Sequence, residues 1–561
     1  MSQGLRRRII ASPTGLVHLW TGGQGPAVIL IHGSPGNAWL VKPIAERLAR
    51  HFCVYAIDTP GFGGSDALPG PIDGVASLAD GYLGILDSIG LPNTLIYGTH
   101  SGAAIGLELA RRHPARVSGF VLEGVPAFTL EEQQPLLDPV YLTSFAPDLL
   151  GGHYTRAWTR FHDQFVWFPW YQREPSHLNE APAGSAADIH LWVEMYFQAL
   201  RHDYQPTYRA VIGYGRGALE AAGEVRMPGV FMAERSDMLF PHLERLPPLG
   251  AGQRIERVTE PAAVPERIEA ALRSLPRAAP GVLLEAFSAA SKIGFHDFAG
   301  GELKLRSRAQ GRGTPVLLLH DAPGAGRQLT DLYEALAVHS PVLLPDLPGC
   351  GDSDALDAGA TLADHADLLA TVVSMRIGGA AHVHAVGMGA ALALELNARH
   401  PQLVAGMTLT GLLRLRGDER RDMIGRLAPP IVLAEDGSHW YRTWLMLRDS
   451  LVRWPWYRRE PQALRRQEIV LDADELHAWT CDVMRQCETY HRLIDAVLSW
   501  DPDAAIAAAR GKVTVGIDAH HALHASDVAW AASGRKAVTL PLAVAERARM
   551  LASLCAAAPS E

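Results

Sequence analysis

The sequence predicts an α/β fold that is built twice along the chain. Four segments, at 28–36, 57–66, 107–114 and 168–175, recur in the same order at 317–324, 344–354, 394–401 and 454–461. The offset barely changes, since Asp58 and Asp346 lie 288 residues apart and Pro169 and Pro455 lie 286 apart. Self-similarity at a fixed period indicates repeated structural units. Within each unit, short apolar runs alternate with stretches of helical spacing, which is typical of a mostly parallel, doubly wound sheet.

The length and composition fit a soluble protein of more than one domain. The 561 residues exceed one compact core, because domains usually hold about 100–250 residues. The net charge of -9 leaves no basic footprint, so we expect no nucleic-acid partner. No apolar run reaches the roughly 18 residues that span a bilayer, and the apolar run after Arg6–Arg8 is too short for a secretion signal. These features, with five scattered cysteines, predict a cytoplasmic protein and no membrane partner.

The first unit can be followed element by element. Buried parallel strands are expected at 28–31, 53–57 and 94–97, because each is a short, continuous apolar run. Helices are expected at 76–89 and 104–112, where apolar residues recur at helical spacing. Ligands of such sheets bind at the carboxyl ends of the strands. The residues just after each strand are therefore the candidates for a functional site.

A boundary between the two units is expected near Pro276 and Pro280. The segment 272–281 interrupts the alternating pattern with these two prolines, which favour a linker. One domain is accordingly predicted at 1–276 and the other at 280–561.

An ordered set of motifs carries a family resemblance. The first unit contains HGSPG at 32–36, DTPGFGGSD at 58–66, GTHSG at 98–102 and LELARRHP at 107–114. In this order they resemble the α/β-hydrolase superfamily, over nearly all of both units. The resemblance implies two tandem α/β-hydrolase domains, each a mostly parallel doubly wound sheet with a helical cap, at about 124–225 and 412–512. It does not imply one reaction, because the superfamily hosts hydrolases, lyases, dehalogenases and cofactor-free oxygenases.

The motif departs from the family at the nucleophile. A nucleophile elbow reads G-x-Nu-x-G, because the sharp strand-to-helix turn needs small flanking residues. Here Gly98 and Gly102 bracket His100, and the matching position of the second unit is Gly387. We expect His100 on the elbow as a nucleophile or general acid/base. The alternative register places Ser101 there and gives up the Gly98 flank.

Two carboxylates are candidates for the supporting acid. Asp237 follows the apolar run 230–233 in the family's acid position, and Glu123 follows the run 120–122, where some haloalkane dehalogenases carry theirs. The family's catalytic histidine should follow the eighth strand, but 254–276 contains no histidine. A Ser-His-Asp triad therefore cannot be assembled from the usual positions. Four histidines of the cap could replace the missing base, although each alone fits a surface or packing role better: His153, His162, His190 and His202.

The oxyanion hole is better preserved. The family forms it from the backbone N–H groups of the residues after the HG pair and after the nucleophile, which here are Ser34 and Ser101. The cap is rich in aromatic residues between Trp158 and Tyr171. Most of them should pack the lid on the body, and some should line the pocket mouth, which favours an apolar or aromatic substrate.

Together these features predict an enzyme in the first unit. Hydrolysis of an ester, a lactone or a carbon–carbon bond in a small apolar or aromatic carbonyl compound is the expected reaction. A lyase or isomerase with His100 as acid/base is the second reading, and a non-catalytic scaffold or binding protein is the third. The second unit is predicted to be non-catalytic, because Asp321 breaks its HG pair, Gly387 its nucleophile and His520 its acid. No cofactor or metal is expected; a small molecule is the expected partner, and a homo-oligomer is left open.

Overall fold

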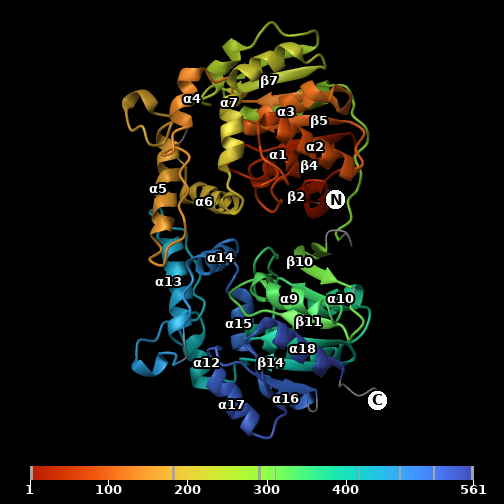
Figure 1. Ribbon diagram of the computed structural model, residues 1–561, viewed down its shortest axis with the longest axis vertical. Helices are drawn as coiled ribbons and strands as arrows, with labels where there is room; N and C mark the ends of the chain where they lie inside the picture. Colours follow the sequence, from red (N-terminus) through yellow and green to blue (C-terminus); the bar gives the residue numbers. More distant parts are fainter. Residues whose placement is uncertain are drawn as a thin grey trace. The chain divides into compact units, whose positions relative to one another are not determined.

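The computed structural model describes residues 4–179, 184–287, 292–309, 311–415, 417–466, 469–509 and 512–556. The chain forms two compact units, one of Met1–Ala146 and Thr155–Ser291, the other of Pro147–Tyr154 and Lys292–Glu561. Their elements run from red to yellow and from green to blue in Figure 1. Each unit holds an 8-stranded sheet. The predicted tandem α/β architecture is confirmed.

The first sheet has the strand order β1-β2-β4-β3-β5-β6-β7-β8. Its first two strands are antiparallel to their neighbours and the rest run parallel. The strands are β1 (Arg6–Ser12), β2 (Gly15–Gly22), β3 (Ala27–Ile31), β4 (Cys53–Ile57), β5 (Thr94–Thr99), β6 (Val117–Glu123), β7 (Gly229–Glu234) and β8 (Gln253–Val258). The helices are α1 (Lys42–Leu48), α2 (Val75–Ile89), α3 (Ser101–Arg112), α4 (Leu130–Leu136), α5 (Gly152–Val166), α6 (Ala186–Leu200), α7 (Gln205–Glu224) and α8 (Val264–Ser274). The strands and helices that we expected from the sequence agree with these within a few residues.

Apolar residues cover both faces of this sheet. In β3, Ile29 and Ile31 pack into the core cluster that contains α2, α3 and α7, whereas Val28 and Leu30 pack into the cluster that contains α1 and α8. Alternate residues of a strand face opposite sides, so a fully apolar strand needs helices on both faces. The second half of α7, after the kink at Gly215, belongs to the first cluster and thus to the body of the unit.

The second sheet repeats the first, with the order β9-β10-β12-β11-β13-β14-β15-β16 when read from its N-terminal edge. Its strands are β9 (Ile293–Phe298), β10 (Gly301–Arg308), β11 (Val316–Leu319), β12 (Val342–Pro345), β13 (Ala381–Val386), β14 (Val404–Thr410), β15 (Val513–Ile517) and β16 (Ala537–Thr539). Its helices are α9 (Thr330–Leu336), α10 (Leu362–Arg376), α11 (Met388–Arg399), α12 (Gly417–Met423), α13 (Ser438–Val452), α14 (Ala473–Met484), α15 (Arg492–Ser499), α16 (Pro502–Ala508), α17 (His524–Ala532) and α18 (Val544–Ala556).

Matching hydrogen bonds show that the repeat is structural. Asp58 accepts from the backbone N–H groups of Ala38 and Gly64, and its counterpart Asp346 accepts from those of Gly326 and Asp352. Each pair of donors comes from the turns that follow the first two parallel strands of its unit. In both units, an equivalent aspartate therefore joins the same two loops by hydrogen bonds.

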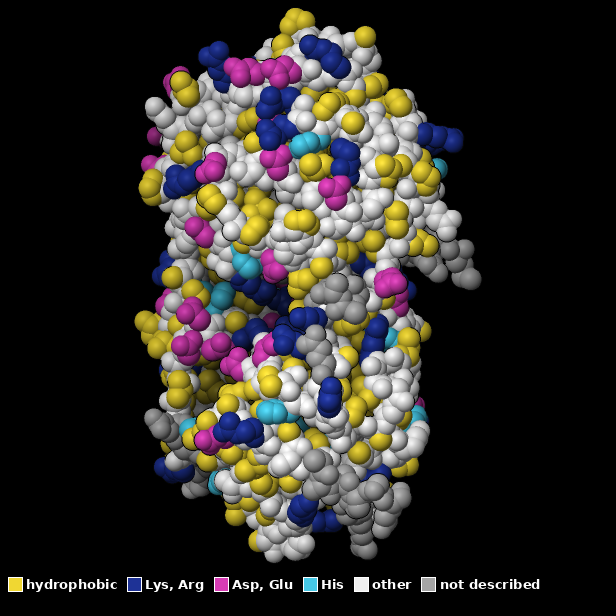
Figure 2. Space-filling view, turned by 45° about the vertical axis from the view of Figure 1, so that its right-hand side comes forward, with side chains coloured by type: hydrophobic (Ala, Val, Ile, Leu, Met, Phe, Trp, Pro, Cys, Tyr) yellow, Lys and Arg dark blue, Asp and Glu magenta, His cyan; other side chains and the backbone are white. Residues whose placement is uncertain are grey.

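The surface carries charges of both signs. On the face drawn in Figure 2, acidic and basic side chains are interspersed, with hydrophobic side chains between them. Among the described helices, none is both long enough and apolar enough to cross a lipid bilayer.

Candidate active site

The turn between β5 and α3 presents His100. The residue has φ 50° and ψ -110°, a region that side-chain-bearing residues rarely adopt. Both flanking glycines are required by close approach. A Cβ on Gly98 would lie 2.4 Å from the Gly102 carbonyl oxygen, and one on Gly102 would lie 2.0 Å from that of Ile31. His100 therefore occupies the central position of the turn, and Ser101 is the first residue of α3.

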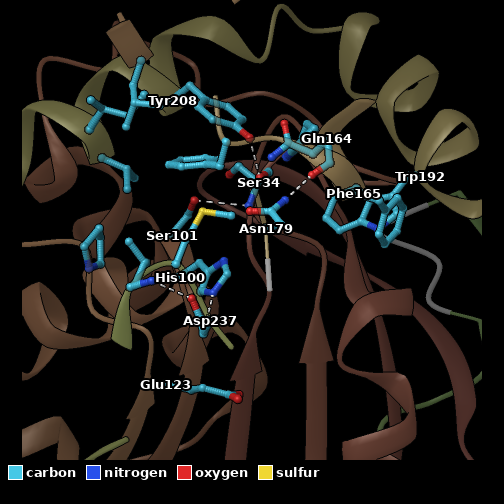
Figure 3. Close-up of a pocket in the computed structure, with 18 of the residues that line it drawn as sticks. Ser34, His100, Ser101, Glu123, Gln164, Phe165, Asn179, Trp192, Tyr208 and Asp237 are labelled. Atoms are coloured by element: carbon cyan, nitrogen blue, oxygen red, sulfur yellow. Dashed lines mark hydrogen bonds and ion pairs between the residues drawn. The ribbon is translucent and has the colours of Figure 1, made fainter. Parts of the chain in front are cut away.

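A carboxylate from the loop after β7, two strands away from β5 in the sheet, holds the imidazole. His100 Nε2 lies 2.8 Å from Asp237 Oδ2, as Figure 3 shows. Asp237 follows β7, and its Oδ1 accepts from the backbone N–H of Leu239 at 2.8 Å. The His100 side chain is 43% exposed and that of Asp237 is 14% exposed. The pair thus fixes one ring nitrogen inside the protein and leaves the other, Nδ1, for a ligand.

The charges around His100 favour its protonated form. Burial opposes the charged imidazole, but attraction to Asp237 and the hydrogen bond between the two outweigh it and raise the pKa of His100 from 6.5 to about 9. Burial likewise opposes ionisation of Asp237, yet His100 brings the pKa of that carboxyl below its ordinary value. The free pair is therefore an imidazolium beside a carboxylate at neutral pH.

Glu123 lies close by but pairs elsewhere. It ends β6 and accepts a hydrogen bond from the hydroxyl of Tyr97 at 2.5 Å. Burial, with the negative charge of Asp237, raises the pKa of Glu123 above its ordinary value although Tyr97 opposes this. In Figure 3 its carboxyl lies apart from the linked His100 and Asp237. Of the two carboxylates that we considered, Asp237 is the one bonded to His100.

The two residues that we expected to form an oxyanion hole, Ser34 and Ser101, are bonded to each other. The backbone N–H of Ser34 donates to Ser101 Oγ at 3.2 Å, and the Ser34 carbonyl accepts from the Tyr208 hydroxyl at 2.7 Å. Ser101 is only 7% exposed. A substrate oxygen that used the Ser34 N–H would have to displace the Ser101 hydroxyl.

These residues open into a cavity of about 590 Å³ beneath the cap. Most of its wall is apolar. Of the cap aromatics that we singled out from the sequence, Phe161, Phe165 and Phe168 line it. The loop after β8, where the family carries its catalytic histidine, contributes Pro261, Val264 and Pro265 instead. Such a cavity suits a small ligand with an apolar or aromatic body.

None of the four cap histidines lines this cavity in the described part of the chain. His162 is 56% exposed and lies 3.4 Å from Asp163, while His202 lines a separate, smaller cavity. His153 and His190 are buried and also lie outside the cavity wall. They do not replace the missing base in this arrangement.

Other residues of the cavity wall were not found from the sequence. They include Arg160 and Gln164 on α5, Tyr208 on α7 and Glu234 at the end of β7. Only Glu234 carried a usable signal, because it directly follows an apolar strand. The others lie on helices, where the sequence does not tell which face meets the ligand.

The second unit keeps the same turn without a side chain. Gly387 has φ 56° and ψ -119°, and a Cβ there would lie 2.0 Å from Asp321 Oδ1. That oxygen accepts from the backbone N–H groups of Ala322 and Met388, each at 2.8 Å. These two donors correspond to Ser34 and Ser101. The carboxylate of Asp321 therefore occupies the two backbone donors that match the expected oxyanion hole of the first unit.

One alignment in the second unit needs correction. We matched His520 with Asp237, but the equivalent residue is His521. The backbone N–H of Leu523 donates to His521 Nδ1 as that of Leu239 donates to Asp237 Oδ1. The spacing between equivalent residues of the two units differs by one in the loop after β15 from the spacing that we assumed. The residue that matches Asp237 is therefore one position further along the chain. The cavity of this unit measures about 250 Å³, less than half the volume of the first.

The described residues contain no group of three or more His, Cys, Asp or Glu that could hold a metal ion. This statement covers only the described part of the chain.

Comparison with known proteins places both units in one family. The family described as alpha/beta hydrolase fold matches residues 26–257 and 314–449, together more than half of the chain. The chain is similar to a pimeloyl-[acyl-carrier protein] methyl ester esterase of Chromobacterium violaceum, 36% identical over 141 residues, which are 25% of this chain and 53% of the esterase. It is also similar to a fluoroacetate dehalogenase of Burkholderia sp, 28% identical over 138 residues, which are 24% of this chain and 45% of the dehalogenase. The chain thus spans about half the length of the curated relatives it matches.

A solved structure with a similar fold is epoxide hydrolase A from Mycobacterium thermoresistibile. The two are 20% identical with a TM-score of 0.38, over 49% of this chain and 99% of that chain.

Proposed function

Because the chain belongs to the α/β hydrolase fold family, we propose that its first unit is a hydrolase of a small apolar or aromatic carbonyl compound, with His100 and Asp237 as the proton-transferring pair. Esters, lactones and activated carbon–carbon bonds are the substrates considered. A methyl ester esterase and a dehalogenase among the relatives support hydrolytic chemistry. The observation that carries the proposal is the 2.8 Å contact of His100 Nε2 with Asp237 at a strained turn that opens into an apolar cavity.

Water is the nucleophile in this proposal. Asp237 holds the Nε2–H of His100, so Nδ1 is the atom that exchanges a proton with the ligand. Neutral His100 takes a proton from water at Nδ1 while the water oxygen attacks the carbonyl carbon. The resulting oxyanion is stabilised by backbone donors at Ser34 and Ser101. The imidazolium then returns its proton to the leaving oxygen or carbon, which yields the acid and the second product.

The raised pKa of His100 favours a second candidate function. An imidazolium with a pKa of about 9 is a ready proton donor at neutral pH. A lyase or isomerase would use that proton to polarise a carbonyl and to protonate an enolate. Hydrolysis needs the neutral ring, and its rate should rise with pH up to about 9. Acid catalysis needs the charged ring, and its rate should fall above about 9.

We propose further that the second unit does not catalyse a reaction. It lacks an elbow side chain at Gly387, and Asp321 occupies the backbone donors that a reacting oxygen would need. Its role would be structural.

The test is a screen of the full-length chain with pH profiles. Aryl acetates, phenylacetate esters, aryl lactones and β-diketones are assayed at pH 6 to 10, with the His100→Ala chain as the blank. Turnover that depends on His100 and rises toward pH 9 supports hydrolysis, whereas turnover that is level below pH 9 and falls above it supports the lyase or isomerase. If the variant turns over the same compounds equally well, the proposed role of His100 is wrong.

A further inference from the structure

A buried arginine of the cap faces the same cavity as His100. Arg160 lies on α5, is 2% exposed and contributes to the cavity wall. Its Nε and Nη1 atoms are buried and have no hydrogen-bond partner. No described carboxylate lies within ion-pair distance of it, whereas Arg173 in the same cap pairs with Asp163 at 2.6 Å. Taking a cation out of water without a partner is unfavourable, so a fold does not keep one for stability alone.

The groups around Arg160 do not neutralise it. The rings of Phe161, Tyr196 and Trp170 lie 4.2, 5.8 and 5.9 Å from its guanidinium carbon. Burial raises the pKa of Tyr141 to about 12 and that of Tyr208 well above its ordinary 10, although the charge of Arg160 opposes both shifts. These phenols are therefore neutral, and the positive charge remains available to a ligand.

A second unsatisfied side chain lies one helical turn further along. Gln164 Oε1 is buried without a hydrogen-bond partner, and Gln164 also lines the cavity. Residues four apart share one face of a helix, so Arg160 and Gln164 present donors and an acceptor to the same side. Figure 3 places Gln164 near Asn179 and Ser34 at the cap side of the pocket.

The second unit shows that the fold does not need this cation. Helix α13 is the counterpart of α5 at an offset of 286 residues, so Arg160 corresponds to Met446 and Gln164 to Ser450. Both counterparts line the smaller second cavity. In the second unit, where the turn carries no side chain, the position equivalent to Arg160 carries no cation, although Arg465 lines that cavity from another element.

We infer that the first cavity binds a substrate with a carboxylate, held by the guanidinium of Arg160 while its carbonyl lies at His100. This inference rests on the proposed function for the position of the carbonyl only. A planar guanidinium matches a carboxylate with two parallel hydrogen bonds. Asp237, Glu123 and Glu234 line the wall near His100 and would repel an anion there, so the negative end points toward Arg160. Among the described residues that line the cavity, Arg160 is the one basic side chain of the lysine or arginine type, which favours a monovalent carboxylate over a phosphate dianion.

Binding to the full-length chain tests the inference without turnover. Calorimetry compares benzoate, phenylacetate and 3-phenylpropanoate with their primary amides and with phenylphosphonate. We expect at least one carboxylate to bind about tenfold or more tightly than its amide, and Arg160→Met to remove that preference. Arg160→Lys should keep part of this preference, because the positive charge remains although the planar guanidinium with its paired N–H donors is lost.

Arg216→Met is the matched control, because Arg216 is 91% exposed on α7 and does not line the cavity. It should bind all ligands like the parent. The inference is overturned if no carboxylate is preferred, if the preference survives in Arg160→Met, or if phenylphosphonate binds more tightly than every carboxylate. A carboxylate preference without any turnover would leave the inference standing and count against the proposed function. Turnover that depends on His100, together with a carboxylate preference that survives in Arg160→Met, would do the reverse.

Discussion

His100 and Gly387 adopt the same left-handed backbone conformation at the same turn of the two units. Their φ and ψ angles are 50° and -110° for His100, and 56° and -119° for Gly387. Glycine accepts this region without strain, whereas a residue with a Cβ pays about 1–3 kcal/mol. The first unit therefore retains a strained side chain at a place where its own repeat shows that none is needed. Strain kept in this way is typical of a functional site.

Two substitutions at this turn separate function from strain. Both His100→Ala and His100→Gly remove the imidazole, and each should lower kcat/KM by about 10²-fold or more. Only glycine adopts a positive φ without strain. The free energy of unfolding of His100→Gly should therefore be about 1 kcal/mol higher than that of His100→Ala. Steady-state kinetics and urea denaturation measure the two effects. Equal stability of the two variants would contradict the strained turn.

Ser101 is the control for this experiment. Its hydroxyl accepts from the Ser34 N–H at 3.2 Å and is not on the turn itself, so Ser101→Ala should keep turnover within about threefold of the parent. A serine-directed fluorophosphonate should leave the chain unlabelled. A label on Ser101, together with an inactive Ser101→Ala variant, would show an ordinary serine nucleophile instead.

Removing the partner carboxylate should lower the pKa of His100. Against the effect of burial, the attraction of Asp237, its hydrogen bond and the weaker attraction of Glu123 raise that pKa to about 9. In Asp237→Asn the effects of burial and of Glu123 both remain, so the pKa of His100 should fall clearly below 9. Titration of the imidazole carbons by NMR measures the change. A pKa that stays near 9 would mean that another group, Glu123 included, charges the ring.

The same pair predicts a pH dependence of stability. The pKa of His100 is higher in the folded than in the unfolded protein. The contribution of the protonated imidazole to the free energy of unfolding is therefore fully present below about pH 6.5 and is lost as the pH rises through about 9. Asp237→Asn should flatten the decline of unfolding free energy over this window. Because the His100 side chain is 43% exposed, solvent screening keeps the effect small.

Local rules account for much of the fold and part of the site. The glycines around His100 fix the turn because their neighbours leave no room for a Cβ, and a pattern of this kind is legible in sequence. Asp237 was found in the same way, as the polar residue after a buried strand. Arg160 was not, because a helix of mixed polar and apolar residues does not tell which of its faces meets a cavity. The role of Asp321 was also out of reach, since its carboxylate bonds to donors from two separate turns.

The Asp321 carboxylate should influence stability and not activity. Burial raises its pKa to about 6 although two backbone N–H groups oppose the shift, so the ionised form is disfavoured in the fold. The cost appears as the pH rises from about 3.8 through about 6 and persists above it. Asp321→Asn keeps an oxygen acceptor without the charge. Its unfolding free energy relative to the parent should therefore improve between pH 4 and pH 8, while turnover stays unchanged. A marked loss of turnover would show that the second unit takes part in the reaction.

The last prediction concerns the stability of the unliganded cap. Replacing the unpaired Arg160 by methionine, the residue found at the equivalent position 446, removes a buried charge and keeps an unbranched but shorter side chain. The lost contact with the Phe161 ring opposes this gain, so Arg160→Met should be as stable as the parent or up to about 2 kcal/mol more stable. Arg173→Met is the comparison, because it leaves the 10% exposed Asp163 without its arginine partner and should lower the unfolding free energy by about 1 kcal/mol or more. Chemical denaturation of both variants without ligand measures the two changes in the free energy of unfolding. If Arg160→Met loses as much stability as Arg173→Met, then Arg160 stabilises the cap and is not kept for an anionic ligand.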